Sequence, residues 1–279
     1  MRAADTERIT VVIPVCDDPL IFRCLASIDL PCRVIVSANG SPPWFLDALR
    51  RYAQATPRIA VLSRAGKGIG GAYNHAIDHV STPWIVLMDS DCVFEPGAIS
   101  RLMARSADAD VVKGRVCFES NNAVSRLVAS ARRLTEDPVL THKVSAYSPP
   151  LLYRIEVVGQ MGGYHFDSRL AWREDRDFEL RRRRAGIPVC AAPDAVIWHK
   201  PLSLRDDLRS VWAYGTGQAM GERLGVLPRL SFAHELRKAC KVLALGLRHG
   251  AVGAALYGTV RGAVLCIGRA ATLQKEHKA

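Results

Sequence analysis

Short runs of apolar and β-branched residues alternate with segments of helical spacing through the first hundred residues, and this alternation constrains the fold most. The runs that read as buried strands are Ile9–Val15, Arg33–Ser37, Ile59–Leu62 and Trp84–Met88. A segment with helical spacing follows each of the first three runs. Strands that alternate with helices form a mainly parallel sheet covered on both faces. The sequence therefore predicts the α/β class, with a mainly parallel central sheet flanked by helices.

The fourth predicted strand ends in two carboxylates, Asp89 and Asp91, with Ser90 between them. If extended geometry continues past the strand, both carboxylates point to the same side. Carboxylates at the carboxyl end of a strand suit a divalent cation held between the protein and phosphate oxygens. Turn or helix-cap residues after a strand are the alternative interpretation.

A glycine-rich loop at residues 65–71 precedes the third predicted helix. Backbone N–H groups at such a place can cradle a diphosphate. The loop lacks the GK[ST] of a Walker A motif, and it does not open the first helix as a dinucleotide-binding fingerprint does. A turn that needs positive φ explains the glycines nearly as well.

Three further side chains are candidates for a site. Glu174 and Asp175 open a predicted helix, where carboxylates serve either as capping and dipole-stabilising groups or as a general base facing a sugar. His199 ends a predicted strand, and it becomes a metal ligand only if the fold brings it to Asp91.

Composition predicts a globular cytoplasmic protein. The chain is 49% hydrophobic, and its eight cysteines show neither a CxxC pair nor zinc spacing, as expected for reduced thiols. The polar N-terminal residues lead directly into a strand, so no signal peptide is predicted. Gly250–Gly268 is apolar but is interrupted by Arg261, which argues against a membrane span.

The C-terminal residues 226–279 form a basic tail. They hold nine Lys or Arg and two Asp or Glu, a net charge of +7 within a total of +11. One face of a predicted helix carries Leu236, Cys240, Leu243 and Leu247. Another face carries Arg237, Lys241 and Arg248. The tail suits an anionic surface, either peripheral membrane or acidic protein, and a solvated helical face is the alternative.

The order of these motifs resembles that of the family 2 glycosyltransferases with the GT-A fold. The matching stretches are Val12–Val15, Asn39–Ser41, Gly71–Ile77, Leu87–Asp91, Gly162–Asp167, Glu174–Gly186 and His199. Each motif alone is loose, whereas the ordered set, over roughly residues 9–200, is specific.

The resemblance implies a nucleotide-diphosphate sugar at the carboxyl edge of the sheet. The donor-binding residues that it implies are Pro14, Val15, Asp17, Asn39, Gly66, Lys67, Asn74, Asp89, Ser90 and Gly163. A divalent cation, Mn²⁺ or Mg²⁺, would be held by Asp91, Asp89 and His199. Asp175, beside Glu174, would be the general base that deprotonates the acceptor.

By the same resemblance, the protein is a metal-dependent, inverting hexosyltransferase that uses a donor linked to UDP and an acceptor hydroxyl or amine. Residues 1–225 would form the catalytic domain, with a nucleotide-binding part at 9–118 and an acceptor part at 119–225, and 226–279 a basic helical extension. Ala38 stands where the family often has an acidic residue, which leaves the base open.

Two other functions compete with this one. A nucleotidyltransferase needs a glycine-rich basic signature after the first strand, and residues 14–20 lack it. A non-catalytic nucleotide-sugar-binding protein would have no need of Asp89, Asp91 and Asp175 together. The acceptor remains open between a small molecule, a lipid carrier and an aglycone on a carrier protein. No nucleic-acid partner is predicted, and a homo-oligomer stays open.

The run Arg181–Arg184 is unusually basic for this position. We expect most of it to form an exposed helix face, with at most one arginine reaching the diphosphate.

Overall fold

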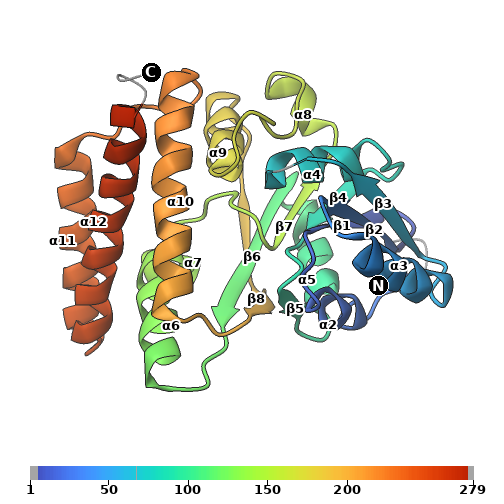
Figure 1. Ribbon diagram of the computed structural model, residues 1–279, viewed down its shortest axis with the longest axis horizontal. Coiled ribbons are helices and arrows are strands. Elements are labelled where there is room, and N and C mark those ends of the chain that lie inside the picture. Colours follow the sequence, from blue (N-terminus) through green and yellow to red (C-terminus); the bar gives the residue numbers. More distant parts are fainter. Residues whose placement is uncertain (1–5, 67, 276–279) are drawn as a thin grey trace. The chain divides into compact units, whose positions relative to one another are not determined.

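The computed structural model describes residues 6–66 and 68–275, which divide into two compact units (Figure 1). The first unit holds the chain up to Val116 together with Val144–Trp198. The second holds Cys117–Lys143 and the chain from His199 onward. The predicted catalytic domain at residues 1–225 and basic extension at residues 226–279 stay a prediction, and the two compact units divide the chain at other positions.

Eight strands of the described residues form one sheet in the order β3-β2-β1-β4-β7-β6-β8-β5. They are β1 Ile9–Val15, β2 Arg33–Asn39, β3 Ile59–Arg64, β4 Trp84–Leu87, β5 Cys92–Phe94, β6 Val111–Phe118, β7 Leu151–Arg154 and β8 Cys190–His199. β1 pairs in parallel with β2 and β4, and β2 with β3. β7 runs antiparallel to both β4 and β6. The predicted α/β class with a mainly parallel sheet is confirmed, and β7 makes the sheet mixed.

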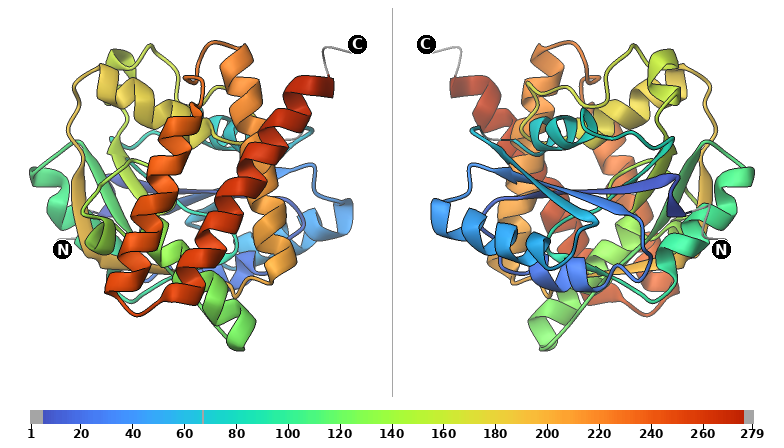
Figure 2. Two further views of the ribbon diagram at one scale, coloured as in Figure 1. Left: turned by 90° about the vertical axis from the view of Figure 1, so that its left-hand side faces the viewer. Right: turned by 90° about the vertical axis from the view of Figure 1, so that its right-hand side faces the viewer.

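Helices cover both faces of the sheet because its central strands are apolar on both sides. Val11 and Ile13 of β1 belong to one buried cluster and Val12 to the other, the period of two that a strand imposes. The first cluster contains buried residues of three helices, α2 Ile21–Ala26, α3 Pro43–Gln54 and α5 Ala98–Ala104. The second contains buried residues of α4 Ile69–Ile77, α8 Val157–Gln160 and α9 Glu174–Arg184. Figure 2 shows α3 and α4 on opposite sides of β1–β3.

The second unit is helical. It contains α6 Ala123–Glu136, α7 Pro138–Thr141, α10 Leu204–Arg223, α11 Phe232–Arg248 and α12 Val252–Lys275. A separate apolar core joins Val128 and Ala131 of α6 to Val242 of α11 and Ala255 of α12. Glycines allow close helix contact, since a side chain at Gly215 would collide with the Leu265 carbonyl. The sequence did not predict α10, and a 3-10 turn at Arg105–Ala107 extends α5.

A buried group of charges ties three helices of this unit together. Asp207 of α10 accepts hydrogen bonds from Arg132 Nε at 2.7 Å and from Tyr257 Oη at 2.8 Å. Arg261 Nε lies 3.0 Å from the same carboxylate. The arginine that interrupts the apolar tail is therefore buried and paired. Of the helices in the described residues, none combines the length and the apolar character needed to cross a bilayer.

Candidate functional site

The parallel strands β1 to β4 end at one edge of the sheet, and several candidate residues follow there. Asn39 ends β2 in register with Arg64 of β3, and Asp89 follows β4 by two residues. In α/β sheets this carboxyl edge is where ligands bind. The shared direction of the four strands brings the loops after them into one neighbourhood.

Asp89 and Asp91 lie in a turn and not in an extended strand. The premise that extended geometry continues to Asp91 is wrong, because β4 ends at Leu87 and the Cys92 amide donates to the Asp89 carbonyl at 3.2 Å. Tyr73 Oη of α4 donates to Asp89 Oδ1 at 2.8 Å and to the Met88 carbonyl at 3.2 Å. The turn and the tyrosine together hold the Asp89 carboxylate in place.

Four acidic groups act on one another in this region. Burial, and then the charge of Asp91, raises the pKa of Asp89 to about 7, against the opposing hydrogen bond from Tyr73. Burial, followed by Asp175 and then Asp89, raises the pKa of Glu174 well above its ordinary value. Glu174 is only 6% exposed, and its Oε2 has no hydrogen-bond partner within the described part of the chain. Such crowded carboxyl groups are stabilised by a cation.

Asp175 differs from its neighbour in its surroundings. Burial raises its pKa, while Arg173, the Arg176 amide and Lys113 oppose that rise. Both adjacent carboxyl groups at the start of α9 therefore hold a proton more strongly than exposed carboxyl groups do. Carboxyl groups with raised pKa values in one site commonly take part in proton transfer.

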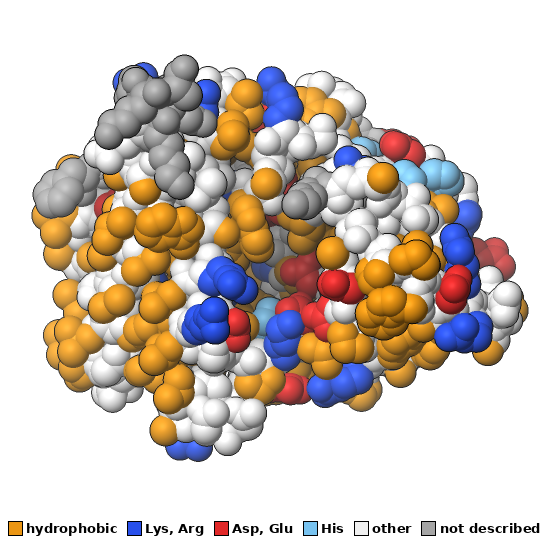
Figure 3. Space-filling view, viewed as in Figure 1, with side chains coloured by type: hydrophobic (Ala, Val, Ile, Leu, Met, Phe, Trp, Pro, Cys, Tyr) orange, Lys and Arg blue, Asp and Glu red, His pale blue; other side chains and the backbone are white. Residues whose placement is uncertain are grey.

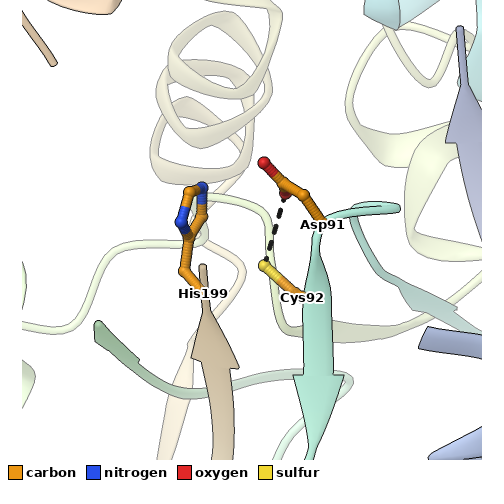
Figure 4. A group of neighbouring side chains, drawn as sticks. All are labelled: Asp91, Cys92 and His199. Carbon is orange, nitrogen blue, oxygen red and sulfur yellow. Dashed lines mark hydrogen bonds between the residues drawn. The ribbon is translucent and has the colours of Figure 1, made fainter. Parts of the chain in front are cut away.

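Asp91, Cys92 and His199 bring their ligand atoms within 4.8 Å of one another (Figure 4). His199 is the last residue of β8, the neighbour of β5 in the sheet. Burial, together with Asp89 and Asp91, raises the pKa of the Cys92 thiol well above its ordinary value, so the thiol stays protonated. Its Sγ donates to Asp91 Oδ1 at 3.8 Å. The carboxylate and the imidazole are therefore the ligands that suit a divalent first-row metal.

Two further contacts orient the histidine. His199 Nδ1 lies 2.8 Å from the Lys200 carbonyl oxygen, and its ring contacts the Phe118 ring in a tilted arrangement with centroids 5.1 Å apart. The carbonyl selects the tautomer with the proton on Nδ1, so that Nε2 carries the lone pair. This is the common arrangement of a histidine that ligates a metal.

The glycine-rich loop is shaped by Asn39. Its Nδ2 donates to the Gly68 carbonyl at 3.1 Å, and its Oδ1 accepts from Arg64 Nη1 at 3.0 Å. Gly66 and Gly68 have φ of +150° and +97°, so the positive-φ explanation of the glycines holds. Lys67 lies outside the described residues.

The side chain of Asn74 serves a different loop. Its Nδ2 donates to the Phe166 carbonyl at 2.8 Å, and its Oδ1 accepts from the Phe166 amide at 3.1 Å. These two bonds fix the segment that leads from Gly163, which has a φ of +80°, to the start of α9. Asn74 thereby couples α4 to the loop that precedes Glu174.

The remaining predicted donor residues lie near the end of β1 and in the turn after β4. Pro14 and Val15 are buried in β1, where Pro14 is opposite Ser37 of β2. Asp17 is exposed, has a φ of +48°, and its amide lies 3.4 Å from Ser41 Oγ. Ser90 is half-buried between the two aspartates.

Arg181 and Arg182 are buried, which contradicts the expected exposed face. Arg181 Nε donates to Asp177 at 2.8 Å, and its guanidinium also donates to the carbonyls of Met161, Tyr164 and His165. Arg182 donates to both oxygens of Glu179 at 2.8 and 3.0 Å. The prediction holds for Arg183 and Arg184, which are exposed. Arg181 and Arg182 can be buried because Asp177 and Glu179, about one helical turn earlier, neutralise their positive charges.

We expect Arg181→Met to lower the free energy of unfolding by about 3–5 kcal/mol, since it leaves Asp177 buried without its cation. For a chain of this size the loss corresponds to a fall in Tm on the order of 10 °C. Arg184→Met, on the exposed side of the same helix, is the matched control, with an expected change within about 0.5 kcal/mol. Equal Tm values for the two variants in calorimetry would contradict the anchoring role.

Three site residues were not found from the sequence. Tyr73 lies inside a quoted motif, Arg64 ends β3, and Lys113 lies in the middle of β6. Lys113 Nζ donates to the Pro149 carbonyl and opposes the raised pKa values of both Asp89 and Asp175. Arg64 could be found from the register of the parallel strands, because it lies opposite the candidate residue Asn39. No comparable pattern marks Lys113.

The chain is similar in structure to proteins that have been solved with nucleotide sugars. It matches mannosyltransferase PcManGT from Pyrobaculum calidifontis, solved with GDP-Man and Mn²⁺, with a TM-score of 0.67 and 18% identity over 96% of this chain and 87% of that one. It matches S. aureus TarS 1–349, solved with UDP-GlcNAc, with a TM-score of 0.56 and 12% identity over 97% and 92%. At these identities the likeness shows the fold, which is GT-A.

The sequence profile described as Glycosyl transferase family 2 matches residues 10–154, which span β1 to β7 and include the Asp89–Asp91 turn. The match covers more than half of the 279 residues. The family resemblance seen in the sequence is confirmed, and the nucleotidyltransferase and non-catalytic alternatives lose their support. The chain belongs to glycosyl transferase family 2 and is a glycosyltransferase.

Proposed function

We propose that this glycosyltransferase transfers a sugar from a UDP-linked donor to an acceptor hydroxyl or amine, with inversion, using a divalent cation and Asp175 as general base. The observation that carries the proposal is the acidic cluster, in which Asp175 raises the pKa values of both Asp89 and Glu174, and Asp91 raises that of Asp89. Carboxyl groups crowded in this way serve both a metal and a proton transfer.

Asp91, Asp89 and His199 would hold the cation. Asp91 and His199 offer a carboxylate and an imidazole, which are ligands of divalent cations. The pKa of Asp89 is raised in part by the charge of Asp91, and a bound cation would relieve that repulsion. When bound, such a cation neutralises the negative charge that develops on the leaving diphosphate. Tyr73 supports Asp89 through its 2.8 Å hydrogen bond, and so acts as a positioning residue.

Asp175 accepts the proton of the acceptor. As the acceptor oxygen or nitrogen forms its bond to the anomeric carbon, its proton moves to the Asp175 carboxylate and the bond to the diphosphate breaks. Attack on the face opposite the diphosphate gives inversion. Burial makes Asp175 a stronger base than an exposed aspartate, while Arg173 and Lys113 favour its ionised form.

Glu174 serves the same step in its protonated form. Its pKa is raised well above the ordinary value, chiefly by burial and then by Asp175, so it does not add a second full charge to the site. A neutral Glu174 leaves Asp175 as the single base at the start of α9. The position of this helix is set by the buried Arg181.

The donor lies, in this proposal, along the carboxyl edge of β1 to β4. The loop after Pro14 and Asn39 faces the base and ribose, and the loop from Gly66 to Asn74 flanks the diphosphate. Asn39 forms hydrogen bonds with both Gly68 and Arg64, and these bonds keep the glycine-rich loop close to β2 and β3. The Arg64 guanidinium adds a cation beside it that suits phosphate.

The proposal is tested by thermal shift with UDP, GDP and dTDP, each with and without Mn²⁺, and then by hydrolysis of the matching sugar nucleotides. We expect UDP with Mn²⁺ to raise the Tm most, because saturation at 100 times Kd adds about 2.7 kcal/mol to stability. A larger rise in Tm with GDP than with UDP would overturn only the choice of UDP as the donor nucleotide, and would leave the rest of the proposal standing. No shift with any nucleotide and metal would overturn the proposed function.

A further inference from the structure

One side of α12 is an exposed stripe made only of apolar residues. Its members are Val252, Leu256, Val260, Ala263, Ile267 and Ala270. Their spacing of three or four residues places them on one face of the helix. Leu256 and Ile267 are each 56% exposed, although aliphatic side chains of this size normally gain stability from burial.

α11 carries a second exposed apolar stripe. Leu236 and Leu247 are 53% and 66% exposed, Cys240 is also exposed, and Leu243 is half-buried. Of the face recognised in the sequence, Leu243 packs against the core, whereas the buried residue of α11 in that core is Val242. Figure 3 shows hydrophobic side chains gathered in the region that α11 and α12 occupy in Figure 1.

The basic stripe of α11 borders this apolar surface. Arg237, Lys241 and Arg248 are all exposed, and each follows an apolar stripe residue by one position. Helical geometry therefore sets the cations along one margin of the apolar stripe. Glu235 is the one acidic residue of α11, and its side chain is only 15% exposed. The surface thus presents cations beside leucines with little negative charge to offset them.

The two helices are neighbours in the helical unit. Gly246 of α11 is in close contact with Ala255 of α12, and Gly258 of α12 faces Val242. Figure 2 shows α11 and α12 side by side in its left view. We define the docking face as the exposed apolar residues of both helices together with Arg237, Lys241 and Arg248.

We propose that the docking face binds an anionic lipid surface, with α11 and α12 lying in the plane of the headgroups. Helices with an apolar stripe beside a Lys/Arg stripe bind membrane interfaces in this way. The exposed cations Arg237, Lys241 and Arg248 are complementary to anionic lipid. A second copy of the chain fits less well, because an isologous contact would bring two basic stripes together.

The test is co-sedimentation of the full chain with two kinds of vesicle, phosphatidylcholine alone and equal parts of phosphatidylcholine and phosphatidylglycerol. We expect binding to the anionic vesicles only, weakening as salt shortens the Debye length below about 10 Å. The variant with Arg237, Lys241 and Arg248 changed to Gln should bind on the order of a hundredfold more weakly.

A matched control removes the same charge from other helices of the unit. Arg126, Arg205 and Arg209 are exposed on α6 and α10, and changing them to Gln should leave most of the binding intact. Leu256→Gln with Ile267→Gln keeps every charge, and should abolish binding at physiological salt while leaving weak attraction at low salt. Donor hydrolysis should be unchanged in all three variants, which shows that they fold.

Four results would overturn the proposal. The first is absence of wild-type binding to anionic vesicles at low salt. The second is an equal loss of binding in the control variant, which would reduce the effect to net charge. The third is vesicle-independent dimerisation that Leu256→Gln disrupts, and the fourth is binding to an acidic protein without binding to lipid. Either of the last two would assign the docking face to another partner.

Discussion

We expect Asp91→Ala to abolish sugar transfer and to remove the Mn²⁺-dependent rise in Tm given by UDP. Asp91 is the carboxylate whose oxygen lies within 4.8 Å of the ligand atoms of His199 and Cys92, so its loss removes the carboxylate that stands beside the imidazole. Removal of a metal's stabilisation of the leaving group costs several kcal/mol of transition-state energy. Thermal shift with UDP, with and without Mn²⁺, measures the binding part, and donor turnover measures the catalytic part.

Cys92→Ala is the control for Asp91→Ala. The Cys92 thiol has a raised pKa and donates to Asp91, so it is not expected to ligate the metal, and the variant should keep the Mn²⁺ effect. If Asp91→Ala still shows metal-stimulated UDP binding, the metal assignment fails. If Cys92→Ala loses that binding as fully as Asp91→Ala does, the thiol is a ligand.

We expect Asp175→Asn to lower kcat by about 10²–10⁴-fold with the donor Kd close to that of the wild type. The amide keeps the shape of the carboxyl group but cannot accept the acceptor's proton. The wild-type kcat should also fall as the pH is lowered, because protonation of Asp175 removes the base. Its raised pKa places that fall at a higher pH than for an ordinary aspartate.

Glu174→Gln separates a base from a helix-capping role. Because Glu174 already favours its protonated form, glutamine replaces it with little change of charge, and kcat should fall far less than in Asp175→Asn. Isothermal titration with the donor gives Kd, and single-turnover kinetics give the chemical step. Equal losses of donor affinity and rate in Asp175→Asn would show that Asp175 only stabilises the start of α9.

Local patterns were enough to predict the α/β sheet and the neighbourhood of the acidic residues. The alternation of apolar runs with helices gave β1 to β4, and parallel strands necessarily end at one edge. Asp89 was recognised because it follows a buried strand. The pattern did not show that β4 stops at Leu87, since Met88 is as buried as the strand before it.

Contacts between distant segments could not be predicted in the same way. The two hydrogen bonds of Asn74 reach Phe166, 92 residues away, and no local spacing records them. Arg181 reads as a surface residue because four arginines follow one another, and its acceptors are backbone carbonyls without a sequence signature. The apolar stripes of α11 and α12 show the opposite failure, because periodicity cannot tell a face that enters the core from one left exposed.

The buried charges of the helical unit have a consequence for the order in which the chain folds during synthesis. Arg132 of α6 meets Asp207 only 75 residues later, and Asp207 meets Tyr257 a further 50 residues on. While the ribosome makes the segment between them, α6 exposes an apolar face, and Glu136 of the same helix is the anionic partner within reach of Arg132. The first unit, whose last segment ends at Trp198, can therefore close on itself before the helical unit does.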